Sequence, residues 1–348
     1  MHEIAKWRNT KKMYRIPKAA ATSTVLLLGF LSVLTPAKSN KPGVKADSAK
    51  GTPVLWRDPG NIASLNLFYG PGGKAHEPRG AFTFDKEDLN GTNPKFDVTD
   101  EDGVKWRVKM GPEARPETVA SRFVWSVGYF ANEDYFMPEL HVQKMQHLRR
   151  GGNLVSPDGT VHNVRLKRHS KDENKIGQWS WSKDPFTGTP EWYGLRVLMA
   201  VMNNWDLKDM NNSIYLTHGE PPEERYVVSD LGASFGSTGL NKALKGNAAA
   251  YSSSKLIKAV TPEFVDFNVP SAPAVVYYLD FPEMGQRLSL LWLGRHIPRA
   301  HARWVGHQLA RLSPEQIRDA FRAGGYSPQE VEQLSSALER RIGELEKL

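Results

Sequence analysis

The sequence contains no cysteine among its 348 residues. Disulfide bonds, thiolate nucleophiles and zinc–thiolate centres are therefore excluded. Without cysteines, the sequence does not distinguish an oxidising from a reducing compartment. A chain of this length can bury a substantial core, so we expect one two-lobed domain or two small domains.

An excess of positive charge is also missing from most of the chain, although the formal net charge is +8. Residues 1–50 hold ten Lys and Arg against two Asp and Glu, which leaves 36 charges of each sign in the remainder. A nucleic-acid-binding domain carries a positive surface, and this remainder is neutral. We therefore expect no nucleic-acid partner.

Residues 1–37 have the pattern of a signal peptide or a membrane anchor. A basic stretch ends at Lys18, and the following run from Ala19 to Ala37 has no charge. Thr35-Pro36-Ala37 is a tolerable cleavage site, and the uncharged run is also long enough to span a bilayer uncleaved. Residues 38–52 are rich in Lys, Pro, Gly and Ser and indicate a flexible tether. We expect the rest of the chain to be exported to the cell envelope or periplasm, with membrane contact only through this segment.

Two alternating segments, 91–98 and 104–110, flank a turn and predict a β-hairpin. In the second strand Trp106 and Val108 should face one side and Lys105, Arg107 and Lys109 the other. Lys109 could then reach the phosphates of a nucleotide. The alternative is that the three cations lie on a solvated face of the strand.

A helix is expected to begin near Pro116, because proline is favoured in a first helical turn. Apolar residues then recur with helical spacing at Val119, Phe123 and Val127. Glu117 lies in the first turn of this helix. It either stabilises the helix dipole, which is the safer assumption, or pairs with Lys109 across the sheet.

The segment from Asn203 to Gly236 contains two groups of polar residues supported by hydrophobic elements. Thr189-Pro190-Glu191 marks the start of a buried helix that should deliver the first group at its C-terminal end. That group contains Asp206, Lys208 and Asn211, and Asp230 follows two short strand-like runs. Phosphoryl transfer needs a carboxylate to orient the acceptor hydroxyl, a cation at the phosphate, and hard oxygen ligands for Mg²⁺. The alternative is an ordinary Asp- and Asn-rich loop after a helix.

These motifs resemble the HipA-type branch of the protein-kinase-like fold over about four-tenths of the chain. The resemblance rests on GTNPKFDVTDEDGVKWRVK, a helix that opens with Glu, YFMPEL, DLKDMN and SDLGASFG. The chain departs from typical protein kinases at Trp205, where they have arginine, and no Ala-Pro-Glu motif follows. The exported segment is also foreign to the cytoplasmic HipA-type kinases.

The resemblance implies a role for each matching residue. Thr92, Asn93 and Lys95 would close over the nucleotide phosphates, Lys109 would contact them, Glu117 would orient Lys109, Asp206 would be the catalytic base, and Asn211 and Asp230 would bind Mg²⁺.

Three further segments bear on the site. The highly charged residues 167–175 predict a solvated loop, and the alternation in 178–181 predicts a strand near the cleft. Trp179 or Trp181 in that strand would either stack on adenine or pack in the core. Residues 232–254 are rich in Gly, Ser, Ala and Lys and indicate either a substrate-docking loop or a plain surface loop.

The fold expected from these patterns is α+β and kinase-like, with a β-rich N-lobe over residues 53–185 and a mostly helical C-lobe over 186–348. The expected function is Mg²⁺-dependent transfer of phosphate from ATP to a hydroxyl of a protein or a small molecule. The alternative is an inactive, kinase-shaped binding or scaffolding protein of the cell envelope.

Overall fold

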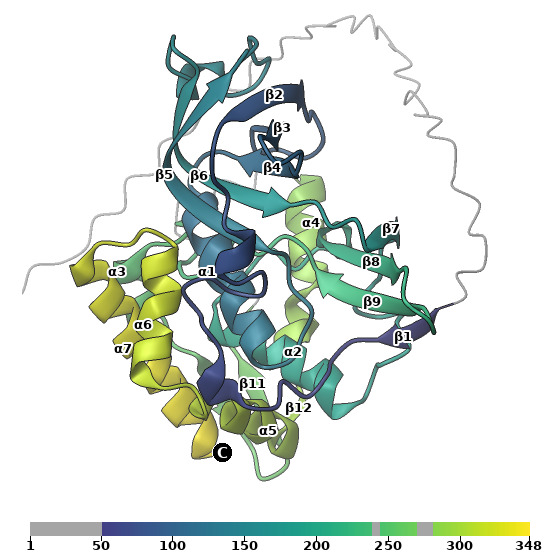
Figure 1. Ribbon diagram of the computed structural model, residues 1–348. Coiled ribbons are helices and arrows are strands. Elements are labelled where there is room, and N and C mark those ends of the chain that lie inside the picture. Colours follow the sequence, from purple (N-terminus) through teal and green to yellow (C-terminus); the bar gives the residue numbers. More distant parts are fainter. Residues whose placement is uncertain (1–50, 239–243, 270–280) are drawn as a thin grey trace, which may run out of the picture. The chain divides into compact units, whose positions relative to one another are not determined.

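The computed structural model describes residues 51–238, 244–269 and 281–348 (Figure 1). The expected mixture of sheet and helix is confirmed at this level, with a sheet-rich N-terminal part and a largely helical C-terminal part. The predicted signal or anchor segment lies outside the described residues. Within the three described ranges, no helix has both the length and the apolar character needed to cross a membrane.

A closed five-stranded barrel forms the sheet-rich part, in the order β2-β3-β4-β6-β5. The predicted hairpin is its centre: Phe96 lies opposite Val108, and Asp97 lies opposite Arg107. The barrel strands are β2 (Phe82–Glu87), β3 (Lys95–Asp100), β4 (Lys105–Lys109), β5 (Asp134–Gln143) and β6 (Thr160–Arg168).

Side chains alternate between the two faces of these strands, so one face fills the barrel and the other carries charge. Trp106 and Val108 share one face of β4, as predicted, and that face is buried in the apolar cluster of the barrel. The opposite face carries Arg107 and Lys109 on β4. Their register partners on β6 are Lys167 and Arg165, so four cations stand side by side on two neighbouring strands.

Helix α1 (Ala114–Ser126) begins two residues before the predicted start and is almost entirely buried. It packs against β5 and β6 (Figure 1). Its apolar stripe continues into the helical part of the molecule, where the rings of Phe123 and Phe321 lie 5.7 Å apart. The helix therefore connects the charged face of the barrel to the main core.

A second sheet has the order β1-β9-β8-β7 and joins segments from both sides of position 185. Its strands are β1 (Thr52–Val54), β7 (Glu173–Gly177), β8 (Asn212–Thr217) and β9 (Glu223–Val228).

The prediction of a solvated loop over residues 167–175 is wrong at both ends, because β6 extends to Arg168 and β7 begins at Glu173, and a loop is left only over 169–172. The predicted strand over 178–181 is also wrong, since β7 ends at Gly177. Trp179 and Trp181 instead pack in the core with ring centroids 4.7 Å apart. Backbone pairing with β8 favours a strand where side-chain composition alone suggested a loop.

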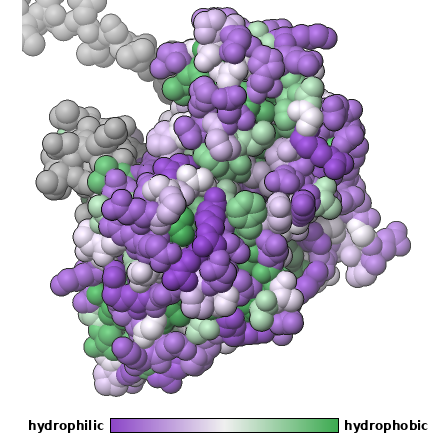
Figure 2. Space-filling model, turned by 60° about the vertical axis from the view of Figure 1, so that its left-hand side comes forward, coloured by the Kyte–Doolittle hydropathy of each residue, from purple (hydrophilic) through white to green (hydrophobic). Residues whose placement is uncertain are grey.

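Helix α2 (Pro190–Val201) starts where predicted, with the Thr189 side chain accepting a hydrogen bond from the Trp192 amide at 3.2 Å. Helices α5 (Arg299–Ala310), α6 (Pro314–Ala323) and α7 (Pro328–Glu346) complete the main core beside it. The remaining elements are η1 (Ile62–Ser64), η2 (Lys74–His76), η3 (Gly152–Leu154), η4 (Asp209–Asn211), α3 (Ala248–Ser253), β10 (Ile257–Val260), β11 (Phe264–Phe267), α4 (Phe281–Ser289), η6 (Leu291–Gly294) and β12 (Ile297–Pro298). Figure 2 shows that hydrophilic residues predominate on the outside of one face, with small apolar patches between them.

Candidate active site

Lys109 is the centre of a buried cluster of charges at the end of β4. Its ammonium lies 2.7 Å from the Glu113 carboxylate, 2.8 Å from that of Glu117 and 3.2 Å from that of Asp230. Only 4% of Lys109 is exposed. Burial alone would lower the pKa of Lys109, but Glu117, Asp230 and Glu113 raise it above its usual value, so the side chain is charged. The alternative of a solvated strand face is therefore wrong for Lys109.

Glu117 makes the pair with Lys109 that the sequence left open. Its second carboxylate oxygen accepts a hydrogen bond from Arg165 at 2.8 Å. Burial raises the pKa of Glu117, and the charges of Arg165 and Lys109 oppose that shift. Two cations on neighbouring strands thus hold one carboxylate on α1, which fixes the helix against the sheet.

Glu113 was missed in the sequence, although it precedes Glu117 by one helical turn. Its carboxylate also accepts a hydrogen bond from the Asn93 side chain at 2.6 Å and binds the Lys245 ammonium. Burial would raise the pKa of Glu113, but Lys109 and Lys245 lower it to about 2. Glu113 therefore ties the β2–β3 connection and the chain around Lys245 to Lys109.

Asp206 occupies a second cluster, next to the end of α2. Its carboxylate lies 3.4 Å from the Lys208 ammonium and 3.6 Å from the Arg287 guanidinium, which comes from α4. That guanidinium also lies 4.7 Å from the ring centroid of Trp205. Burial raises the pKa of Asp206, and Lys208 and Arg287 oppose the increase. A carboxylate of raised pKa that is still partly accessible is suited to accept a proton from a hydroxyl.

Asn211 and Asp230 are brought together by the backbone. The Asn211 carbonyl accepts hydrogen bonds from the Ser229 amide at 2.7 Å and the Asp230 amide at 3.3 Å. The Asn211 side-chain amide donates to the Asp206 carbonyl at 2.8 Å. The residues that the sequence placed in two separate groups are thus adjacent.

Three predicted phosphate-loop residues differ in their positions. Asn93 reaches the buried cluster through Glu113, and Lys95 lies directly opposite Lys109 in the β3–β4 pair. Lys95 is half-buried, and burial lowers its pKa. Thr92 is exposed. Asn93 and Lys95 therefore lie at the same end of the barrel as Lys109.

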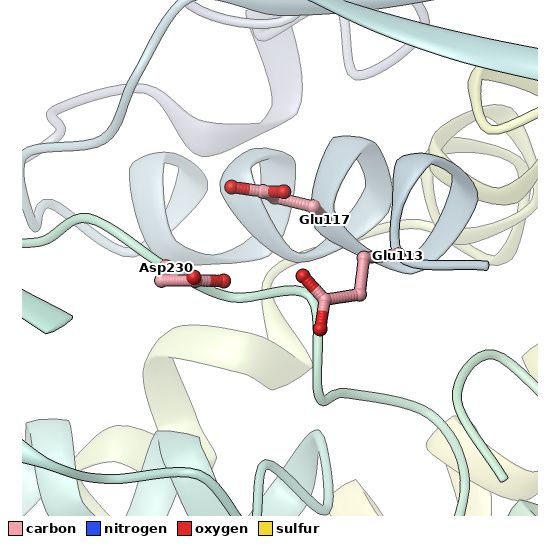
Figure 3. Close-up of side chains that lie close together, drawn as sticks. All are labelled: Glu113, Glu117 and Asp230. Atoms are coloured by element: carbon pink, nitrogen blue, oxygen red, sulfur yellow. The ribbon is translucent and has the colours of Figure 1, made fainter. Parts of the chain in front are cut away.

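Oxygen ligands suited to Mg²⁺ are present beside Lys109. One oxygen of Asp230 is engaged by Lys109 and by the Gly232 amide, while none of the described residues donates to the other oxygen. The side-chain oxygen of Asn211 likewise accepts from none of the described residues. Oxygens of Glu113, Glu117 and Asp230 also lie within 4.8 Å of one another (Figure 3). Asp230 and Asn211 fit a hard cation better than the two glutamates, whose oxygens are occupied by ammonium and guanidinium groups.

A hollow of about 760 Å³ extends between the barrel and the second sheet. Arg107 on β4, Lys167 on β6 and Tyr215 on β8 are among its lining residues. Arg107 makes two hydrogen bonds to Asp97, at 2.8 and 3.1 Å. Arg107 stands two residues before Lys109 on β4, and Lys109 itself is not among the residues that line the hollow.

The chain matches no protein-family model, and no curated protein is similar to it in sequence. Among solved structures it is similar to a Helicobacter pylori proinflammatory kinase, CtkA, with a TM-score of 0.43 and 11% sequence identity. The similarity covers 78% of this chain and 98% of that chain. A likeness of this size is too small to establish a shared chemistry.

Proposed function

We propose that this protein is a kinase-like, Mg²⁺-dependent phosphotransferase that uses ATP and transfers phosphate to a hydroxyl of a protein or a small molecule. The observation that carries the proposal is the contact of the buried Lys109 ammonium with Glu117 on α1 and with the partly exposed Asp230 after β9. The three residues come from separate elements, and each has the charge that phosphoryl transfer requires. The proximity of Asp230 to Asn211 and Asp206 supports the same conclusion.

Each residue then has a defined task. Lys109, held by Glu117 and Arg165, binds phosphate oxygens of the nucleotide, and Asn93 and Lys95 border the same place. Asp206 accepts a hydrogen bond from the acceptor hydroxyl, and Lys208 beside it stabilises negative charge on the transferred group. Asp230 and Asn211 would hold Mg²⁺, which neutralises phosphate charge when bound. The exported or membrane-anchored location remains part of this proposal and rests on residues 1–37.

A non-catalytic, kinase-shaped binding protein of the cell envelope is the second candidate, and Glu113 is the observation that favours it. Only 5% of Glu113 is exposed, and its carboxylate lies 2.7 Å from the Lys109 ammonium, where it places a third negative charge around that cation. Phosphate would have to compete with this carboxylate for Lys109. ATP is also scarce outside the cytoplasm, which an exported kinase would have to overcome.

Thermal unfolding of the full chain with and without Mg·ATP separates the two candidates. A ligand that binds only the folded state raises the melting temperature by mass action. We expect a rise that needs both Mg²⁺ and ATP and that is lost in Asp230→Ala. No shift at millimolar nucleotide would overturn the phosphotransferase proposal and favour the binding protein.

A further inference from the structure

Two lysines from different sheets converge on one tyrosine in the hollow. Lys167, near the end of β6, donates a hydrogen bond from its ammonium to the Tyr215 hydroxyl at 3.2 Å. Its ammonium also lies 5.5 Å from the centroid of the Tyr215 ring. Lys175 on β7 is the direct register partner of Tyr215 on β8. Side chains that are register partners lie next to each other on one face of a sheet, so the Lys175 side chain lies beside Tyr215 as well.

These two lysines have no acidic partner in the part of the chain that the structure describes, since no carboxylate there lies within 4.0 Å of either ammonium. Two other charged groups that line the hollow have partners of their own, whereas Asp58 and Asp172, which also line it, form no ion pair within 4.0 Å in the described residues. Arg107 is held by Asp97 at 2.8 Å. Glu173, which also lines the hollow, forms an ion pair with Arg225 at 3.7 Å. The local charge at Lys167 and Lys175 is therefore positive, in contrast to the balanced cluster around Lys109.

The titration of Tyr215 agrees with this local charge. Burial alone would raise the pKa of the Tyr215 phenol, but Lys167 and Lys175 lower it below its usual value. Burial and the neighbouring Lys167 also lower the pKa of Lys175, which Tyr215 partly opposes. A lowered pKa is expected for a phenol whose surroundings stabilise a negative charge. It is also expected for a lysine whose surroundings disfavour a further positive charge.

We propose that Lys167, Lys175 and Tyr215 form an anion-binding subsite that holds a phosphate or carboxylate group of a small-molecule ligand in the hollow. The Tyr215 hydroxyl accepts its hydrogen bond from Lys167, which leaves its own hydrogen to donate to the anion. The two ammonium groups supply charge-assisted hydrogen bonds, which are stronger than those between neutral groups. The subsite does not depend on ATP or on the residues around Lys109.

The place of the subsite indicates which ligands could use both regions. Lys167 is the register partner of Arg107, and Arg165 is the register partner of Lys109. The two pairs are two residues apart along each strand, a separation of about 7 Å. If the proposed phosphotransferase activity holds, Lys109 holds the nucleotide phosphates, and this subsite holds an anionic group of the acceptor substrate beside them. The substrate class would then be a hydroxyl compound that carries a phosphate or carboxylate group.

Calorimetric titration of the full chain at low salt, without Mg²⁺ or nucleotide, tests the subsite. The probes are inorganic phosphate and, separately, succinate. We expect saturable binding of at least one probe, at least tenfold weaker binding by Lys167→Gln/Lys175→Gln, and several-fold weaker binding by Tyr215→Phe. Lys171→Gln removes an exposed lysine from the β6–β7 connection and should bind as the parent does. The stronger of the two probes identifies the preferred anionic group.

Two results would overturn the proposal: no saturable binding of either probe, or equal affinity in the parent and in the double variant. Circular dichroism checks that each variant is folded, and Tyr215→Phe keeps the test valid if the double variant is not. Asp230→Ala should lose the stabilisation by Mg·ATP and keep the affinity for the probe. Failure of the phosphotransferase proposal and failure of the anion subsite therefore give different results.

Discussion

Lys109 and Arg165 stand opposite each other on β4 and β6 and bind different oxygens of the same carboxylate, that of Glu117. Both distances are 2.8 Å. Because the three groups are buried, each contact fixes the position of the others. The position of α1 against the barrel and the position of the Lys109 ammonium are thus coupled.

Substitution of the two aspartates should separate binding from transfer. Asp230→Ala removes the carboxylate best placed for Mg²⁺ and should abolish the melting-temperature rise with Mg·ATP. Asp206→Ala should keep that rise and lower phosphate transfer by about 10²–10⁴-fold, because only the proton acceptor is lost. Thermal unfolding and radiolabelled phosphate transfer measure the two effects. Equal loss of both in the two variants would contradict the assigned roles.

Removal of Arg165 should destabilise the protein strongly. Arg165→Met leaves Glu117 with Lys109 as its one cation. It also removes the only ion pair within 4.0 Å that Asp134 makes with a described residue, which has a length of 3.5 Å. Breaking a buried ion pair from one side costs about 3–5 kcal/mol. Urea unfolding followed by fluorescence measures this loss.

The matched control for Arg165 is Arg79→Met, which removes an exposed arginine that pairs with Asp102 at 3.6 Å. An exposed pair contributes about 0–1 kcal/mol, so this variant should unfold close to the parent. A loss in Arg165→Met no larger than that of the control would show that the cluster does not hold α1 in place.

Acid should weaken the protein partly through Glu113. The pKa of Glu113 is lowered in the folded protein from 4.5 to about 2, so its contribution is present above about pH 5 and is lost as the pH falls toward 2. That shift corresponds to at most about 3 kcal/mol. Glu113→Gln should be less stable than the parent at pH 7, and the difference should shrink toward pH 2. A difference that is constant with pH, measured by urea unfolding, would exclude this ionisation as the cause.

Gly232→Ala should be destabilising because the site leaves no room for a methyl group. A Cβ at this position would lie 2.7 Å from the Glu113 carboxylate, whose side chain is held by Lys109, Lys245 and Asn93. Overpacking of this kind costs about 1–3 kcal/mol. Gly219→Ala is the control, since the nearest atom there is 4.0 Å away. Similar melting temperatures for the two variants would show that Glu113 moves aside freely.

Much of the local structure follows from the sequence. The alternation around Trp106 and Val108 placed Lys109 on the correct face, and the Thr189 cap fixed the start of α2. The pair between Lys109 and Glu117 was one of two alternatives. The structure favours it because α1 begins five residues after β4 ends, so that its first turn lies against the end of the strand.

Other contacts depend on segments far apart in the chain and have weak local signals. Glu113 and Glu117 are spaced to share one helix face, which could have identified Glu113. Arg165 alternates with the apolar Val164 and Leu166, a sign that it shares a face with Lys167. Nothing near Arg287 in the sequence indicates that it reaches Trp205 and Asp206, because only the packing of α4 brings them together.

The short strand β1 determines how far the N-terminal segment can be removed by proteolysis or truncation. β1 pairs in parallel with β9 and covers an edge of the second sheet that would otherwise be open. Open strand edges recruit strands from other molecules, and the β9 sequence EERYVV ends in three residues of high β propensity. Cleavage after Val54 would therefore expose the edge of β9, which could then pair with a strand of another molecule. Residues 51–54 thus protect the second sheet against aggregation through that edge.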